Sequence, residues 1–319
     1  MLQEPERSAD PIRVHEGYIA PLFSLPLKLP ATAWHGHIPF LFVLFRNLKP
    51  ARYVDLGVHW GASLIAAASA SQAYDLETEL WGIDTWAGDI HTQAYEGDEM
   101  YADLRSYLDR NFSGVHLLRS TFDHAREGFD GRPVDLLHID GLHTYEAVKH
   151  DFDTWLPVMS ERGVVLFHDT MERDHGFGVW RLWEELKHEF PSLEFVHSHG
   201  LGVLFVGAKS LDDPFLKRLV EDPARFESYR ATVSRIAGLL PFRCAHLHFE
   251  AELQSFVANG DDPEEIVQRY KAHMEPAAKP LLSRTGESRG LAARVRRWLK
   301  GRSRGATRRP DDQGEPPGK

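Results

Sequence analysis

Short apolar runs alternate with longer amphipathic segments through the middle of the chain. Each run is too uniformly apolar for a strand with one wet face, so it predicts a strand buried on both faces, as in a helix-covered parallel sheet. Strands that alternate with helices in this way are typical of an open α/β sheet. The pattern predicts strands at 52–56, 80–84, 115–119, 134–140 and 164–168, with helices at 61–73, 96–111 and 144–159.

The last part of this pattern differs from the rest. After a predicted helix at 179–190, two apolar runs at 193–197 and 201–206 are separated by a very short turn around His199-Gly200. Strands joined this closely must be antiparallel. We therefore predict a Rossmann-like, seven-stranded α/β sheet that is mostly parallel and ends in an antiparallel C-terminal hairpin.

Composition divides the chain into four parts. Residues 1–47 form a lead-in or cap with some helix, 48–208 the α/β domain, and 209–280 a polar helical appendage. The tail at 281–319 is rich in Arg, Gly, Ser and Pro, which predicts disorder. From position 283 it carries eleven Lys and Arg against four Asp and Glu, and residues 291–300 place apolar side chains opposite arginines. Such a segment can touch an anionic membrane surface peripherally or simply act as a solubilising tail.

Charge and cysteine content narrow the classes of protein. A net charge of −10 and 42% hydrophobic residues are typical of a soluble globular protein whose acidic body repels nucleic acid. The chain contains no apolar run as long as a transmembrane segment, and its N-terminus is too polar for a secretory signal. Its single cysteine, Cys244, excludes an internal disulfide framework and a cysteine-rich zinc module. We expect a cytoplasmic homo-oligomer.

A glycine-containing loop follows the first predicted strand. Gly57 and Gly61 allow the backbone to turn sharply, so that a helix N-terminus can face a ligand. His59 stands where the dinucleotide fingerprint has its second glycine, which disfavours a pyrophosphate and therefore an NAD-dependent oxidoreductase.

Polar residues also end the next two predicted strands. Asp84 ends the second strand, where a carboxylate can accept hydrogen bonds from both ribose hydroxyls. Ser120, Thr121 and Phe122 end the third strand and suit an adenine ring. The bland alternative is that the glycines allow close packing and that Asp84 caps a helix. Three such features at consecutive strand ends favour an adenosine-type ligand.

A second polar cluster follows the fourth and fifth predicted strands. Asp140 ends one strand, His143 lies three residues further on, and His168-Asp169 ends the neighbouring strand. Carboxyl ends of neighbouring strands meet at the ligand-binding edge of such sheets. Successive strand residues face opposite ways, so His168 and Asp169 can share a ligand only if the strand has ended. The cluster can hold a divalent metal or supply a general base, and His143 fits either role. His138, inside an apolar strand, is expected to be a core residue.

Five motifs together resemble one enzyme superfamily. They are Asp-Leu-Gly-x-x-x-Gly-x-Ser at 55–63, Gly-Ile-Asp-Thr-Trp at 82–86, His-Ile-Asp-Gly-Leu-His-Thr-Tyr-Glu at 138–146, Val-Leu-Phe-His-Asp-Thr at 165–170 and Phe-Gly-Val-Trp at 177–180. The chain resembles a class I S-adenosylmethionine-dependent methyltransferase from about 48 to 206. Within that superfamily it is similar to a bacterial small-molecule branch, associated with polysaccharide genes and like the metal-dependent O-methyltransferases.

This resemblance implies roles for individual residues. The cofactor-binding residues would be Asp55, Gly57, Gly61, Ser63, Asp84, Thr85, Ser120, Thr121, Phe122 and Asp140. Asp140, His168 and Asp169 would bind a metal, and Asp140, His143 and His168 would be catalytic. Histidine where the metal-dependent enzymes carry a carboxylate shifts the preference from Mg²⁺ toward Mn²⁺, Fe²⁺ or Zn²⁺.

The resemblance also implies an activity. The chain would methylate a hydroxyl group of a sugar or another small hydroxylated molecule, with or without help from the metal. The alternative is a non-catalytic binding protein that keeps the fold and serves a glycosyltransferase system.

Overall fold

The computed structural model describes residues 20–30, 32–88 and 97–246, together with a few isolated positions up to 274. The chain divides into two compact units, residues 1–244 and 245–319. The sheet and the site lie in the first unit. Most of the predicted helical appendage beyond residue 246 and the whole basic tail lie outside the described residues. In the part of the chain that is described, no helix is long and apolar enough to cross a membrane.

The predicted sheet is confirmed. Its seven strands lie in the order β3-β2-β1-β4-β5-β7-β6. The first five strands in this order are parallel to one another, and β7 is antiparallel to both β5 and β6. The strands are β1 (Arg52–Leu56), β2 (Glu79–Asp84), β3 (Val115–Arg119), β4 (Val134–Ile139), β5 (Met159–His168), β6 (Ser192–Phe195) and β7 (Leu201–Phe205).

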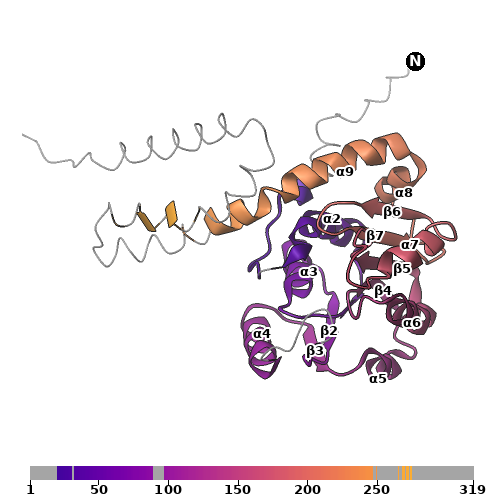
Figure 1. Ribbon diagram of the computed structural model, residues 1–319, viewed down its shortest axis with the longest axis horizontal. Coiled ribbons are helices and arrows are strands. Elements are labelled where there is room, and N and C mark those ends of the chain that lie inside the picture. Colours follow the sequence, from indigo (N-terminus) through magenta and orange to yellow (C-terminus); the bar gives the residue numbers. More distant parts are fainter. Residues whose placement is uncertain are drawn as a thin grey trace, which may run out of the picture. The chain divides into compact units, whose positions relative to one another are not determined.

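Helices cover both faces of this sheet, and Figure 1 shows α3 and α6 on opposite sides of it. One face packs against α2 (Ile38–Leu48), α3 (Ala62–Ala73), α4 (Gly97–Asn111), α8 (Pro214–Glu221) and α9 (Pro223–Ala237). The other face packs against α5 (Phe122–Arg126), α6 (Tyr145–Trp155) and α7 (Val179–Leu186). The structure also contains the short 3-10 helices η1 (Ala20–Phe23), η2 (Ala33–His37), η3 (Glu127–Phe129) and η4 (Leu156–Val158), and residues 240–246 are helical.

Helix α2 lies in the centre of the hydrophobic core. Nine of its eleven residues are buried, and the helix contacts α3, α9 and both N-terminal 3-10 helices. A helix that is apolar nearly all round must be buried in this way. The described segments at 20–48 and 211–244 therefore share one core with the sheet.

Most element boundaries agree with the sequence pattern to within a few residues, but two features differ. Strand β5 begins at Met159 and not at 164. The sequence pattern places its start too late, because residues 160–162 are polar and interrupt the apolar run. The short helix α5 begins directly after Thr121, whose side chain caps it by accepting a hydrogen bond from the His124 N–H. A single helical turn of this length leaves little periodicity in a sequence.

Candidate functional site

Polar side chains from three adjacent strands project from one face of the sheet. Asp55 on β1 lies directly beside His138 on β4. Because residues two apart on a strand share a face, Asp140 follows on the same side as His138. His168 ends the neighbouring strand β5. The sheet thereby brings buried polar groups to the edge where parallel strands end.

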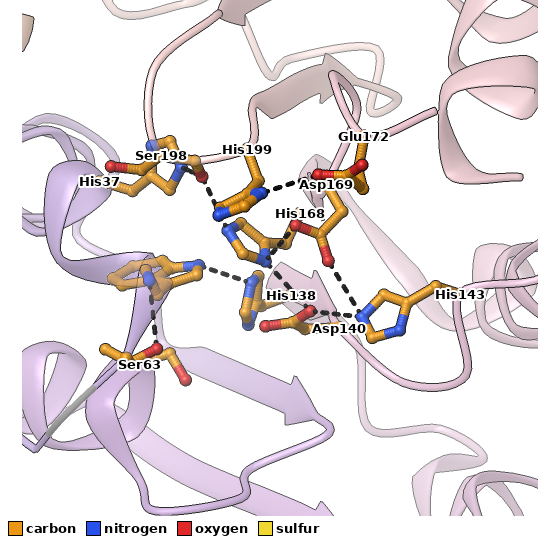
Figure 2. A network of polar contacts seen from close by, with 12 residues as sticks. His37, Ser63, His138, Asp140, His143, His168, Asp169, Glu172, Ser198 and His199 are labelled. Atoms are coloured by element: carbon orange, nitrogen blue, oxygen red, sulfur yellow. Dashed lines mark hydrogen bonds and ion pairs between the residues drawn. The ribbon is translucent and has the colours of Figure 1, made fainter. Parts of the chain in front are cut away.

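Two carboxylates and two imidazoles meet at this edge, as Figure 2 shows. The His143 Nε2 atom lies 3.3 Å from Asp140 Oδ1 and 3.1 Å from Asp169 Oδ2. The His168 Nδ1 atom lies 3.2 Å from Asp140 Oδ1 and 3.3 Å from Asp169 Oδ1. The four residues predicted at this cluster therefore form one network.

The backbone at Asp169 explains how adjacent residues reach the same point. Strand β5 ends at His168, and Asp169 has a left-handed backbone with φ of 63°. This conformation breaks the strand alternation, so both side chains turn toward Asp140. Aspartate is among the residues that tolerate it best, although it is uncommon for any residue other than glycine. Strand β5 has thus ended before Asp169, which is the condition for His168 and Asp169 to share a ligand.

The carboxylates hold both imidazoles in their charged form. Burial alone would lower the pKa of His168, but the charge of Asp140 and the hydrogen bonds from both carboxylates raise it to about 10. Burial likewise opposes a charge on His143, and the same two carboxylates raise its pKa to about 9. Burial would raise the pKa of Asp140, yet His168 and His143 hold it well below its usual range.

The hydrogen bonds of His168 also define what a cation would meet there. Its Nε2 atom lies 3.1 Å from the carbonyl oxygen of Ser198, so Nε2 must carry a proton and donate it. The Nδ1 atom facing the carboxylates then either carries a second proton or offers its lone pair to a metal. Ligand atoms of Asp140, His143 and Asp169 all lie within 4.8 Å of one another. This mixed N/O donor set fits a divalent transition metal.

A small cavity of about 240 Å³ lies beside the cluster. Asp84 lines this cavity, and its carboxylate accepts the backbone N–H groups of His59 at 2.9 Å and Trp86 at 2.7 Å. It thus ties together the loops after β1 and β2. Of the predicted cofactor residues, the cavity is lined by Gly57, Asp84, Thr85, Thr121, Phe122 and Asp140, together with His59, Gly88, Gly141, Leu142 and His143.

Gly57 shows why this loop requires glycine. Its φ is +90°, and a Cβ atom there would lie 2.0 Å from the backbone oxygen of Asp140. The loop after β1 therefore touches the loop after β4 directly. Any side chain at this position would push the loop after β1 away from the polar cluster.

The other four predicted cofactor residues do not line the small cavity. Asp55 is fully buried, and its carboxylate contacts His138 Nδ1 at 2.7 Å and accepts the Ser63 hydroxyl at 2.6 Å. Gly61 precedes α3, where a Cβ atom would meet the Leu104 side chain. Ser120 donates its backbone N–H to the Asp84 carbonyl.

No motif in the sequence points to the partner on the far side of His138. The indole N–H of Trp34 donates to His138 Nε2 at 3.0 Å. Because an indole only donates, His138 must be protonated at Nδ1 and must donate to Asp55. His138 is thus the core histidine that was expected, in a buried chain running from Trp34 to Ser63. Trp34 lies 104 residues away along the chain and shares no motif with His138.

A larger cavity of about 970 Å³ opens on the other side of the cluster. It shares Gly57, His59, Asp140 and His143 with the small cavity, so the two adjoin along these residues. Asp174, His175 and Phe177 come from the loop between β5 and α7. The remaining lining residues are Thr32, Ala33, Val58, Trp60, Ala62, His168, Asp169, Glu172 and His199.

Comparisons with known proteins agree with this class of fold. Residues 54–170 match a family model described as a methyltransferase domain. This match confirms the predicted resemblance to a methyltransferase over this region, whereas the class I, S-adenosylmethionine-dependent assignment and the polysaccharide-associated branch stay predictions. An uncharacterized protein of Sinorhizobium fredii is 47% identical over 191 residues, which are 58% of this chain and 21% of that protein. The chain thus spans about a fifth of the length of this curated relative.

Solved methyltransferase structures are also similar. The O-methyltransferase from Bacillus cereus in complex with S-adenosylhomocysteine is 15% identical, with a TM-score of 0.41, and the similarity covers 62% of this chain and 92% of that one. The O-methyltransferase TomG from Streptomyces achromogenes, in complex with S-adenosylmethionine, is 18% identical, with a TM-score of 0.40 and coverage of 63% and 91%.

Proposed function

We propose that this protein is an S-adenosylmethionine-dependent O-methyltransferase that acts on a sugar or another small hydroxylated molecule. One observation carries the proposal: Asp140 and His143 line both cavities. A cofactor in the small cavity and an acceptor in the large one would then meet at these two residues. The methyltransferase-domain match over 54–170 supports the cofactor.

In the small cavity, Asp84 would accept hydrogen bonds from the ribose, and Phe122 would lie against the adenine. The methyl group is transferred by direct displacement, so the protein must align the acceptor oxygen with the sulfonium. Orientation of this kind lowers barriers by about 7–11 kcal/mol in favourable cases. The two-cavity arrangement is suited to it.

The polar cluster would remove the proton of the acceptor hydroxyl. Asp140 and Asp169 lie within reach of the cavity, and His143 connects them. One of these carboxylates would accept the proton, and the charged His143 between them would stabilise the remaining negative charge. Asp140, Asp169 and the two imidazoles would also hold a divalent metal, which supplies Lewis-acid activation of a hydroxyl when bound.

The test combines cofactor binding with metal analysis. We expect the full chain to bind S-adenosylhomocysteine in calorimetry and to copurify with a divalent metal. Asp169→Ala, at a residue that lines the larger cavity but not the small one, should lose the metal while retaining affinity for S-adenosylhomocysteine. A chain that binds no S-adenosylhomocysteine, or that binds it but methylates none of a panel of hydroxylated acceptors, would favour the non-catalytic alternative.

A further inference from the structure

The wall of the larger cavity carries an uneven set of charges. Four carboxylates line it, namely those of Asp140, Asp169, Glu172 and Asp174, whereas no Lys or Arg is found among the described residues that line it. The inner pair, Asp140 and Asp169, is balanced by the contacts with His143 and His168. A divalent metal held there would balance the inner pair equally well. Of the outer pair, Glu172 contacts the His199 imidazole at 2.9 Å, whereas the exposed Asp174 contacts neither imidazole of the cluster.

Glu172 is held in place as an anion at this wall. Its Oε1 accepts the backbone N–H groups of Arg173 at 3.2 Å and Asp174 at 3.3 Å, and its Oε2 lies 2.9 Å from His199 Nδ1. The hydrogen bond with His199 and these backbone contacts lower the pKa of Glu172. The carboxylate is therefore negative at neutral pH and fixed in position beside Asp169, as Figure 2 shows.

The cation nearest in sequence is turned away from the cavity. Arg173 lies between Glu172 and Asp174, yet it does not line the wall. Its guanidinium lies 4.4 Å from the centre of the Trp180 ring, and Nη1 donates to the carbonyl oxygen of Thr170. Stacking on tryptophan satisfies an arginine without an anionic partner. The loop after β5 therefore places the carboxylates of Glu172 and Asp174 at the cavity wall, whereas Arg173 does not line the wall.

We infer that the larger cavity selects neutral or cationic hydroxylated acceptors and rejects acceptors that carry a phosphate or a carboxylate. As a statement about methyl transfer, this inference rests on the proposed function. As a statement about binding, it stands alone. Like charges brought together in a partly buried site repel, and sites discriminate between ligands as much by repulsion as by attraction. Unphosphorylated sugars and amino sugars fit this charge pattern, whereas sugar phosphates and nucleotide sugars do not.

Three probes of similar size test the charge selection. Catechol, dopamine and 3,4-dihydroxybenzoate share two adjacent hydroxyls but are neutral, cationic and anionic. Calorimetry would measure their dissociation constants on the full chain saturated with S-adenosylhomocysteine at pH 7.5, where an imidazole of ordinary pKa is mostly neutral. We expect 3,4-dihydroxybenzoate to bind at least about tenfold more weakly than catechol, which is about 1.4 kcal/mol, and dopamine to bind at least as tightly as catechol.

Matched variants assign the effect to the two outer carboxylates. The double variant Glu172→Gln, Asp174→Asn keeps the hydrogen-bonding oxygens and should narrow the gap between 3,4-dihydroxybenzoate and catechol at least threefold. The single variant Asp174→Asn, at an exposed position, should narrow it in the same direction. Glu161→Gln, near the opposite end of β5, should leave it unchanged. Unaltered affinity for S-adenosylhomocysteine would show that each variant is folded.

Several outcomes would overturn the inference. These are an anionic probe that binds as tightly as catechol, no binding by any of the three probes, or a gap that is the same in the double variant. Failure of the proposed function looks different: the chain would bind no S-adenosylhomocysteine or transfer no methyl group, whatever the order of the three dissociation constants.

Discussion

The buried contact between Trp34 and His138 should contribute measurably to stability. In Trp34→Phe, the His138 Nε2 atom loses its donor inside a residue that is 0% exposed. Moving the proton from Nδ1 to Nε2 would not help, because Asp55 would then lose the donor it now has at 2.7 Å. Either way one buried polar group has no partner, which costs about 1–3 kcal/mol.

The smaller ring adds a second cost. Trp34 is 2% exposed, so replacing its indole with a phenyl ring leaves a cavity beside His138. A cavity of a few heavy atoms costs on the order of 1 kcal/mol. We therefore expect Trp34→Phe to lower the free energy of unfolding by about 2–4 kcal/mol in total.

The assay is urea unfolding followed by far-ultraviolet circular dichroism, since fluorescence changes with the tryptophan itself. Trp180→Phe is the matched control. It removes an indole N–H that donates to the Phe177 carbonyl at 3.0 Å, at a half-buried position where water can replace the donor. We expect this control to lose less than about 1 kcal/mol. If Trp34→Phe destabilises the chain no more than Trp180→Phe, the buried chain from Trp34 to Ser63 is not a stabilising element.

Three further predictions concern the site. Asp84→Ala should weaken S-adenosylhomocysteine binding at least about tenfold in calorimetry, without loss of helical circular dichroism, since its carboxylate would hold the ribose; equal affinity would exclude that role. Asp169→Asn, which preserves the left-handed backbone, should weaken Mn²⁺ or Zn²⁺ binding without changing affinity for S-adenosylhomocysteine, and metal retention would remove Asp169 from the ligand set. For metal-free protein, the pKa values of His143 and His168, about 9 and 10, exceed the unfolded value near 6.5. The contribution of these two imidazoles to the free energy of unfolding should be complete below pH 6.5 and lost as the pH rises toward 10. The loss should be smaller in His143→Gln. Urea unfolding at pH 6, 8 and 10 measures it, and a free energy of unfolding that does not change over this range would contradict the prediction.

Local patterns predicted most of the fold. The apolar runs located the strands because burial on both faces leaves a continuous signal in the sequence, and the short turn near His199 implied the antiparallel hairpin. The start of β5 was placed late because Ser160 and its neighbours are polar. The strand extends back to Met159 because this residue pairs with Val134 of β4 beyond a shift in register, which local hydropathy does not report.

The site residues likewise include some that local patterns predict and others whose role depends on tertiary packing. Asp140, His168 and Asp169 were predictable as a cluster, because strand ends that are neighbours in a parallel sheet bring their following residues together. That reasoning treated Asp55 and Asp140 alike, although one binds a buried histidine and the other faces two cavities. Asp55 and Asp140 differ in their surroundings because different segments of the chain pack against β1 and against the end of β4.

By itself, the sequence determined which segments are strands, their direction and the edge at which polar residues gather, because these depend on short-range periodicity and on general rules of sheet topology. Only the tertiary structure decided that Trp34 reaches His138 and that Arg173 stacks on Trp180 instead of facing the cavity. Such contacts depend on how distant segments pack together. They leave no repeating pattern in the chain from which they can be inferred.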